Sequence, residues 1–171
     1  MRKIAEKIEY SPTTIYLYFK DKSDLLVQIC EETFAGLAKK LEAIDAKYDD
    51  PFEGLKEGCR AYINFALKHP NHYKVVFIMM PQEEADAGQY EYVGSMGDKA
   101  FSYLRENVAN CIKQNKKSRV DVVDVDVASQ VIWAALHGLT SLLITHKDFP
   151  WASREKLIGQ MIDMIIRTVQ E

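Results

Sequence analysis

Apolar residues recur every three or four positions along almost the whole chain, and no stretch alternates apolar with polar residues as a strand would. The pattern therefore predicts an all-α protein. We expect three short helices, over residues 4–8, 12–19 and 73–80. We also expect five longer helices: one of about 24 residues that begins after Asp21, and others over 52–67, 93–112, 124–146 and 153–169.

The starts of two early helices carry clear signals. Ser11 followed by Pro12 is typical of an N-cap and a first helical residue, and Asp21 with Asp24 three positions later is typical of a second N-cap. Polar segments at 82–89 and 114–119 are expected to form a surface loop and a link between helices. The chain should divide into a small head at 1–26 and a larger helical domain at 27–171.

Two short helices joined by a tight turn, as expected for this head, are typical of a helix-turn-helix. In that motif the first residues of the second helix meet base edges in the major groove of DNA. Here those residues are Pro12, Thr13 and Thr14. Tyr16 and Tyr18 have the reach to hydrogen-bond phosphates, and Lys22 adds positive charge at the start of the next helix.

The remaining side chains of this short helix should anchor it. Ile15 and Phe19 are four residues apart and are expected to face inward, with Leu17 leaning towards the following helix. A plainer interpretation is that the aromatic residues only pack the helix, and the chemistry of the residues leaves both interpretations open.

The same residues resemble the DNA-binding signature of TetR-family transcriptional regulators. The similarity covers residues 4–7 and then 11–26, where Tyr-x-x-Phe is followed by Lys-x-x-Leu. It implies a DNA-binding regulator of the repressor type, in which Tyr16 and Lys22 contact phosphates while Thr13, Thr14 and Tyr18 face bases or backbone. Further along, Trp133 and His137-Gly138 resemble the Trp…His-Gly element of one subgroup of the family's C-terminal domains.

Two features depart from the family pattern. The turn between the two motif helices usually contains glycine, whereas here it reads Ile8-Glu9-Tyr10, and a side chain there is expected to need a left-handed backbone. The family's first helix lies ahead of Arg2, so the apolar faces of the head are expected to be partly uncovered. A second hypothesis is therefore a dimeric ligand-binding or protein-interaction module that does not bind DNA.

The larger domain of TetR-like proteins holds a small-molecule pocket and a dimer interface, and the same is expected of 27–171. The last two helices are apolar on more than one face, whereas a surface helix needs only one apolar stripe. The surplus predicts a two-fold four-helix interface with a second copy, burial inside one subunit being the alternative. The expected interface residues are Leu136, Leu139, Leu143, Leu157, Met161, Ile162 and Ile165.

The effector pocket is expected among aromatic and methionine side chains of the larger domain, although such residues often form ordinary core. No arginine pair stands out to hold an anion, so we expect a small, hydrophobic and largely uncharged effector. The candidates are Tyr62, Phe65, Phe77, Met80, Met96, Phe101, Tyr103, Trp133 and His137.

Composition and net charge bear on DNA binding, on disulfides and zinc, and on membrane insertion. The net charge is −3 over 171 residues, so the whole chain does not have the basic character of many DNA-binding proteins, although residues 1–24 carry a net charge of +1. Three widely spaced cysteines without a CxxC pair predict neither disulfides nor structural zinc, and indicate a reducing cytoplasm. No continuous apolar run reaches the length of a membrane span.

Signs of catalysis are weak. His69 and His72 have the spacing of metal ligands, with Glu83 and Glu84 nearby, but Pro70 interrupts a helix between them. No cysteine is accompanied by a nucleophile motif, and no glycine-rich loop is available to hold phosphate. We therefore expect no enzyme activity, no metal and no cofactor.

Overall fold

The computed structural model describes residues 1–79, 91–115 and 124–170, and these residues form helices and no strand, as predicted. The predicted loop at 82–89 and most of the link at 114–119 lie outside this part of the chain. The helices are α1 (Arg2–Lys7), α2 (Pro12–Tyr18), α3 (Lys22–Asp45), α4 (Pro51–Lys68), α5 (Pro70–Lys74), α6 (Met96–Gln114), α7 (Val125–Thr145) and α8 (Arg154–Gln170), with a π-helical turn, η1 (Val75–Met79), after α5.

Side-chain caps explain where several of these helices begin. The Ser11 hydroxyl accepts a hydrogen bond from the Thr14 N–H at 3.1 Å, and the Asp21 carboxylate accepts one from the Asp24 N–H at 2.8 Å, which confirms both predicted N-caps. Asp50, Ser95 and Asp124 cap α4, α6 and α7 in the same way. The starts of these five helices are therefore set locally, by capping residues that can be recognised in the sequence.

Two helices begin three residues away from their predicted starts. The helix expected at 73–80 starts at Pro70, because proline at a first helical position loses no hydrogen bond that the helix would have made. The π-helical turn replaces its second half. The helix expected from residue 93 starts at Met96, after the Ser95 cap, and leaves Val93 exposed.

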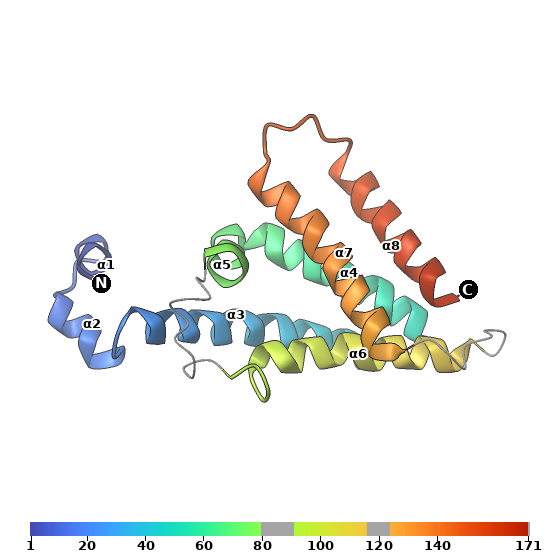
Figure 1. Cartoon of the computed structure of the whole chain (residues 1–171), viewed down its shortest axis with the longest axis horizontal. Coiled ribbons are helices and arrows are strands. Elements are labelled where there is room, and N and C mark those ends of the chain that lie inside the picture. Colours follow the sequence, from blue (N-terminus) through green and yellow to red (C-terminus); the bar gives the residue numbers. More distant parts are fainter. Residues whose placement is uncertain (80–90, 116–123, 171) are drawn as a thin grey trace.

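The arrangement separates a head from a body (Figure 1). Helices α1 and α2 lie at one end of the long helix α3, away from the other helices. The rest of α3 lies beside α6, and α4, α7 and α8 lie on one side of this pair. Helix α3 therefore belongs to both regions, since its first turn joins the head and its remaining turns pack into the body.

The core of the body lies where α3, α4, α6, α7 and α8 meet. Its most buried members include Leu55, Ile63, Val108 and Ile132. Helix α7 is long and apolar enough to cross a membrane by length and composition alone, but a core helix passes the same test. In this structure one face of α7 packs into the core and another is exposed, so α7 is buried on one side only.

Candidate DNA-binding head and ligand cavity

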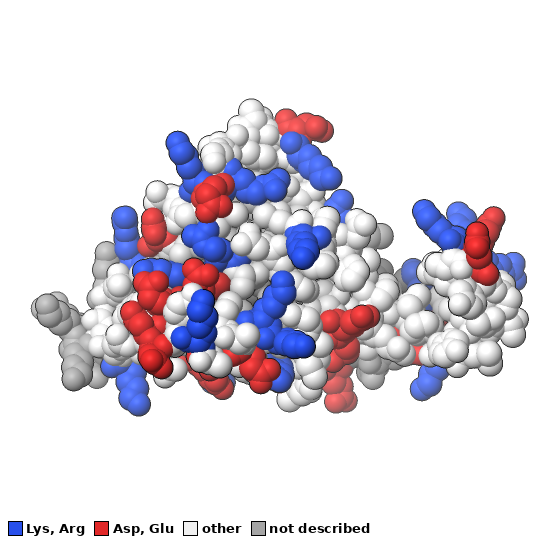
Figure 2. Space-filling view, turned by 180° about the vertical axis from the view of Figure 1, so that it is seen from behind, with Lys and Arg blue, Asp and Glu red and all other residues white. Residues whose placement is uncertain are grey.

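Helix α2 presents its polar and aromatic side chains to solvent. Thr13 is exposed, and the side chains of Tyr16 and Tyr18 are 52% and 74% exposed. Pro12 at the helix start and Lys22 in the first turn of α3 are also exposed. Figure 2 shows lysine and arginine side chains projecting from the same end of the molecule. The structure thus brings the predicted DNA-contacting residues together at one tip.

Thr14 differs from its neighbours. Its hydroxyl lies 2.8 Å from the Ser11 hydroxyl, and its backbone N–H donates to the same oxygen. Its side chain is half-buried. Thr14 therefore helps to fix the start of α2, whereas Thr13 has the more accessible hydroxyl.

The inward face of α2 is partly as expected. Ile15 is buried and Phe19 half-buried. The expectation for Leu17 was wrong, because this side chain is 78% exposed. Residues two apart on a helix point in nearly opposite directions, so a helix that buries Ile15 turns Leu17 outward.

The turn between α1 and α2 has the strained backbone that the sequence suggested. Glu9 has a φ of 60°, in the left-handed region that glycine adopts more easily. The apolar side chains of Ile4 and Ile8 on α1 are about half exposed, as expected for this head. The head therefore has little buried surface of its own.

A hydrogen-bond network fixes the joint between α2 and α3. The Asp24 carboxylate accepts from the Lys20 N–H at 2.8 Å and from the Gln28 amide at 3.1 Å, while the Asp24 N–H donates to Asp21. The hydrogen bond from Lys20, followed by that from Gln28, lowers the pKa of Asp24. The carboxylate therefore stays ionised at neutral pH and ties the end of α2 to the first turn of α3.

The body encloses a cavity of about 570 Å³ between α3, α4, α6 and α7. Four of the nine predicted pocket residues line it: Tyr62, Phe101, Tyr103 and Trp133. The other lining side chains include a row along α3 whose spacing in the sequence indicates only one face of an amphipathic helix, namely Phe34, Leu37, Leu41 and Ile44.

The remaining pocket candidates lie elsewhere. Phe65 packs against His69 and under the Lys40 ammonium, and Met96 begins α6 with its N–H donated to Glu31. Phe77 and His137 belong to an aromatic cluster beside the cavity, and Met80 lies outside the described residues. These four described residues do not line the cavity, because core and cavity use the same residue types.

The aromatic cluster connects the cavity wall to α5 and η1. Phe77 contacts Phe34 with ring centroids 5.5 Å apart and His137 with centroids 5.0 Å apart. The Tyr73 hydroxyl lies 2.7 Å from Nδ1 of His137 and 3.2 Å from its carbonyl oxygen. Burial raises the pKa of Tyr73 and lowers the pKa of His137, so both groups favour their neutral forms.

A second, more open space of about 390 Å³ adjoins the cavity. Asp45 and Asn107 line both, and the outer space is bordered by polar residues that include Tyr48, Asp49 and Lys113. The apolar cavity therefore borders a polar groove at the end of α3.

The seven predicted interface residues divide into two groups. Leu139, Leu157 and Met161 are half-buried. Leu136, Leu143, Ile162 and Ile165 are 3–6% exposed and belong to the core of one chain, so a partner could not reach them without unfolding. The exposed large apolar side chains of these two helices are Val127, Val131, Trp133, Leu142 and Met164.

The described part of the chain gives little support for a metal site or for a reactive cysteine. It contains no group of three or more histidine, cysteine or acidic residues able to hold a metal ion, and Glu83 and Glu84 lie outside it. The rings of His69 and His72 are 5.8 Å apart, and His72 lies 3.4 Å from the Thr33 hydroxyl. Burial raises the pKa of Cys59 and Cys111 to about 12, which suppresses the reactive thiolate.

Two family models match the chain. Residues 55–165 match "Tetracyclin repressor-like, C-terminal domain", and residues 1–29 match "Bacterial regulatory proteins, tetR family". No curated protein sequence matches the chain significantly.

Solved structures share the fold at low sequence identity. A protein of unknown function from Rhodococcus sp. RHA1 has a TM-score of 0.78 at 18% identity, covering 99% of this chain and 84% of the other. The TetR family transcriptional regulator PfmR from Thermus thermophilus has a TM-score of 0.73 at 19% identity, covering 97% and 86%. At these identities the likeness is one of fold.

Proposed function

Because the chain belongs to the TetR family of bacterial transcriptional regulators, we propose that it is a repressor whose binding to an operator is controlled by a small hydrophobic effector. The supporting observation is that α3 joins two regions. Its first turn carries Lys22 beside the exposed α2, and its later turns form a wall of the cavity. A ligand that moves this wall therefore moves the head.

The proposed DNA contacts follow from exposure and chemistry. Thr13 faces base edges with its hydroxyl and methyl group, and Pro12 and Thr14 set the start of the helix that carries it. Tyr16, Tyr18 and Lys22 bind phosphates, which fixes the register of α2 in the groove. Residues 1–26 would then be the DNA-binding head and 27–171 the effector and dimerisation domain.

A two-fold dimer would place two heads on a palindromic operator. The exposed face of α7 supports this, since Val127, Val131 and Leu142 lie within one stripe with Ala134 and Gly138 between them. A Cβ added to Gly138 would meet nothing within 4 Å, so another helix could approach closely there. We place the interface on this stripe and on Leu139, Leu157, Met161 and Met164.

A ligand would control DNA binding through residues that belong both to the cavity wall and to the proposed interface. Gln130, Trp133 and Ala134 of α7 line the cavity, and Ala134 also lies on the proposed interface stripe. A ligand that binds better to one spacing of the two heads than to the other shifts the protein towards that spacing. It can weaken DNA binding by no more than the difference between its binding free energies for the two spacings. The protein would act in the cytoplasm, with its three cysteines reduced.

The proposal is tested by selecting duplexes from a random library with the purified protein and measuring binding by fluorescence anisotropy. Thermal-shift screening of small hydrophobic compounds then supplies candidate effectors. We expect a palindromic operator and at least one stabilising compound that weakens operator binding. Stabilising compounds without any selected duplex would instead favour the ligand-binding module that does not bind DNA, for which the half-exposed Ile4 and Ile8 of the head are the supporting observation.

A further inference from the structure

We propose that the effector is an amphipathic molecule whose uncharged polar end binds the side-chain amide of Asn107, while its apolar body fills the cavity. Primary alcohols and carboxamides with an aromatic or aliphatic body belong to this class, because their polar end both accepts and donates hydrogen bonds. This inference rests on the proposed function, since it names the chemical class of the ligand for the same cavity. Gly54 is the residue that positions the Asn107 amide.

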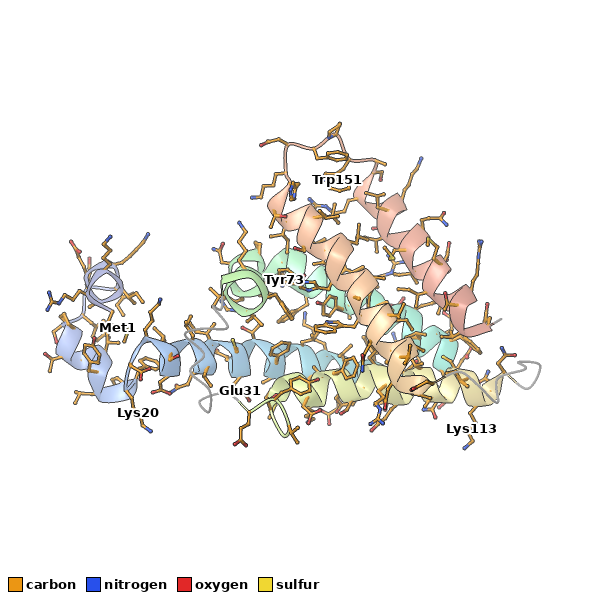
Figure 3. All side chains as sticks on the ribbon, viewed as in Figure 1. Met1, Lys20, Glu31, Tyr73, Lys113 and Trp151 are labelled. Carbon is orange, nitrogen blue, oxygen red and sulfur yellow. The ribbon has the colours of Figure 1, made fainter. Side chains whose placement is uncertain are left out.

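The polar end of the ligand would lie where the cavity meets the polar groove. Asp45 at the end of α3 and Asn107 on α6 line both spaces. Lys113, which borders the groove, lies at the end of the body opposite the labelled Met1 of the head (Figure 3). A ligand that reaches this junction from the cavity therefore has apolar walls along its body and polar groups at one end.

The Asn107 amide has hydrogen-bonding capacity that the described residues do not use. Asn107 is half-buried, and its amide oxygen accepts the weak S–H donor of Cys111, 3.7 Å away. Its amide nitrogen donates to no group in the part of the chain that the structure describes, and it retains accessible surface. This nitrogen can therefore donate a hydrogen bond to an oxygen atom of the ligand.

Gly54 allows the Asn107 amide to lie against α4. It is buried near the start of that helix, and a Cβ added to it would lie 2.8 Å from the amide nitrogen of Asn107. Two such atoms do not pack so closely, so alanine at this position would displace the amide. Glycine inside a helix is less favourable than alanine, and this close approach is a physical reason for its presence.

The charges at the junction favour an uncharged polar end. Among the described residues that line the cavity, Asp45 alone is charged, and Asp49 and Lys113 border the groove. A ligand carboxylate would lose hydration and be repelled by Asp45, and an ammonium group would face the N–H donors of Asn107. A hydroxyl or carboxamide avoids both conflicts, because it can accept from Asn107 and donate to Asp45.

A second amide lines the cavity but is less suited to fix a ligand. Gln130 on α7 is exposed, and its side chain is one bond longer than that of Asn107. Ordering a longer, exposed side chain costs more conformational entropy. Asn107 is instead held between Gly54 and Cys111, so we place the polar end of the ligand beside it.

Three probes of matched shape test this inference: 2-naphthalenemethanol, 2-ethylnaphthalene and 2-naphthoate. Equilibrium dialysis against the full chain measures the dissociation constant of each. We expect Asn107→Ala to weaken binding of the alcohol about fivefold relative to the hydrocarbon, the size expected for one lost hydrogen bond. Gln130→Ala is the matched control, because it removes the other amide that lines the cavity and should leave this ratio unchanged.

The third probe tests the preference for an uncharged end. We expect 2-naphthoate to bind more weakly than the alcohol to the unmodified chain, because Asp45 repels its carboxylate. Asp45→Asn should reduce this difference. Stronger binding of 2-naphthoate than of the alcohol to the unmodified chain would overturn the chemical class that we propose.

Two glycines of α4 test whether the position of the amide matters. Gly54→Ala keeps the amide but displaces it, and should lower the ratio of alcohol to hydrocarbon affinity as Asn107→Ala does. Gly58→Ala is the matched control, since its Cβ would meet only the Leu41 side chain, at an ordinary 3.8 Å. In the Asn107→Ala background, Gly54→Ala should change the ratio no further, because no amide remains to be displaced. A further change there would overturn the positioning role of Gly54.

Failure of the inference can be told apart from failure of the proposed function. An unchanged ratio in Asn107→Ala, or a lowered ratio in Gln130→Ala alone, would overturn the inference but keep a ligand-binding cavity. If none of the three probes binds the unmodified chain, both this inference and effector control by the cavity are overturned. Selection of an operator remains a separate measurement, since it depends on the head.

Discussion

The head and the body use similar residue types in opposite ways. On α2, Tyr16 and Tyr18 point into solvent, whereas Tyr62 and Tyr73 on α4 and α5 are buried. Leu17 is exposed at the tip of the head, while Leu55 lies at the centre of the body. The body is shaped by its own packing, and the exposed aromatic side chains of the head indicate a surface completed by another molecule.

Figure 3 shows the difference directly. Side chains crowd between α3, α4, α6 and α7 around the labelled Tyr73, while those of the head spread outward around the labelled Met1. Buried positions in α1 and α2 are limited to Ala5 and Ile15. The head should therefore unfold locally at a lower cost than the body.

Truncation of a core isoleucine in each region gives the largest expected contrast. Ile63→Ala removes a side chain that is 0% exposed in the body, and should cost about 3 kcal/mol, or roughly 10 °C in melting midpoint. Ile15→Ala should loosen the head and leave the midpoint of the body within about 2 °C. Calorimetry checks both, and equal shifts would show that head and body unfold as one unit.

Charged substitutions of exposed leucines give the next contrast. Leu142→Glu places two like charges at the proposed two-fold interface and should weaken self-association more than about 100-fold. Leu17→Glu is the matched control, because it adds the same charge to a more exposed leucine on the head. Sedimentation velocity measures both. A monomer from Leu17→Glu, or a dimer from Leu142→Glu, would move the interface away from α7.

Substitution of two lysines at different positions on α3 tests whether the head contacts DNA and the body does not. Lys22→Ala should weaken operator binding by about tenfold and reduce the salt dependence by about two counterions per dimer. Lys39→Ala removes the same charge from an exposed position further along α3 and should change neither. Anisotropy titrations at several salt concentrations make this measurement, and identical behaviour of the two variants would argue against phosphate contact by Lys22.

The smallest effect concerns the turn of the head. Glu9→Gly relieves a left-handed backbone and should stabilise the head by about 1 kcal/mol, while Glu9→Ala keeps a Cβ and should not. Hydrogen exchange of the amides in α1 and α2 reports the change. Slower exchange in both variants would mean that the side chain of Glu9, rather than its backbone, is responsible.

Features fixed by short-range chemistry were predictable from the sequence. The Ser11 and Asp21 caps, the long helix after Asp21 and the strained turn at Glu9 all depend on neighbouring residues. The family assignment also came from a contiguous motif. Such features need no knowledge of how distant helices meet.

Features fixed by long-range packing were harder to predict. An α7 that is apolar all round does not reveal which side meets α4, so Leu136 was assigned to the surface although it lies in the core. Tyr62 and Phe77 look alike in sequence, but only Tyr62 lines the cavity.

The hydrogen bonds around Asp24 fix the head to the end of α3, so that a tilt of this helix moves the head with it. A helix of 24 residues is about 36 Å long, so a tilt of about 5° at the cavity end displaces the far end by roughly 3 Å. That distance is close to the separation of successive base pairs, ~3.4 Å. In the proposed dimer, a ligand that only slightly widens the body would thus put the two heads out of phase with the double helix.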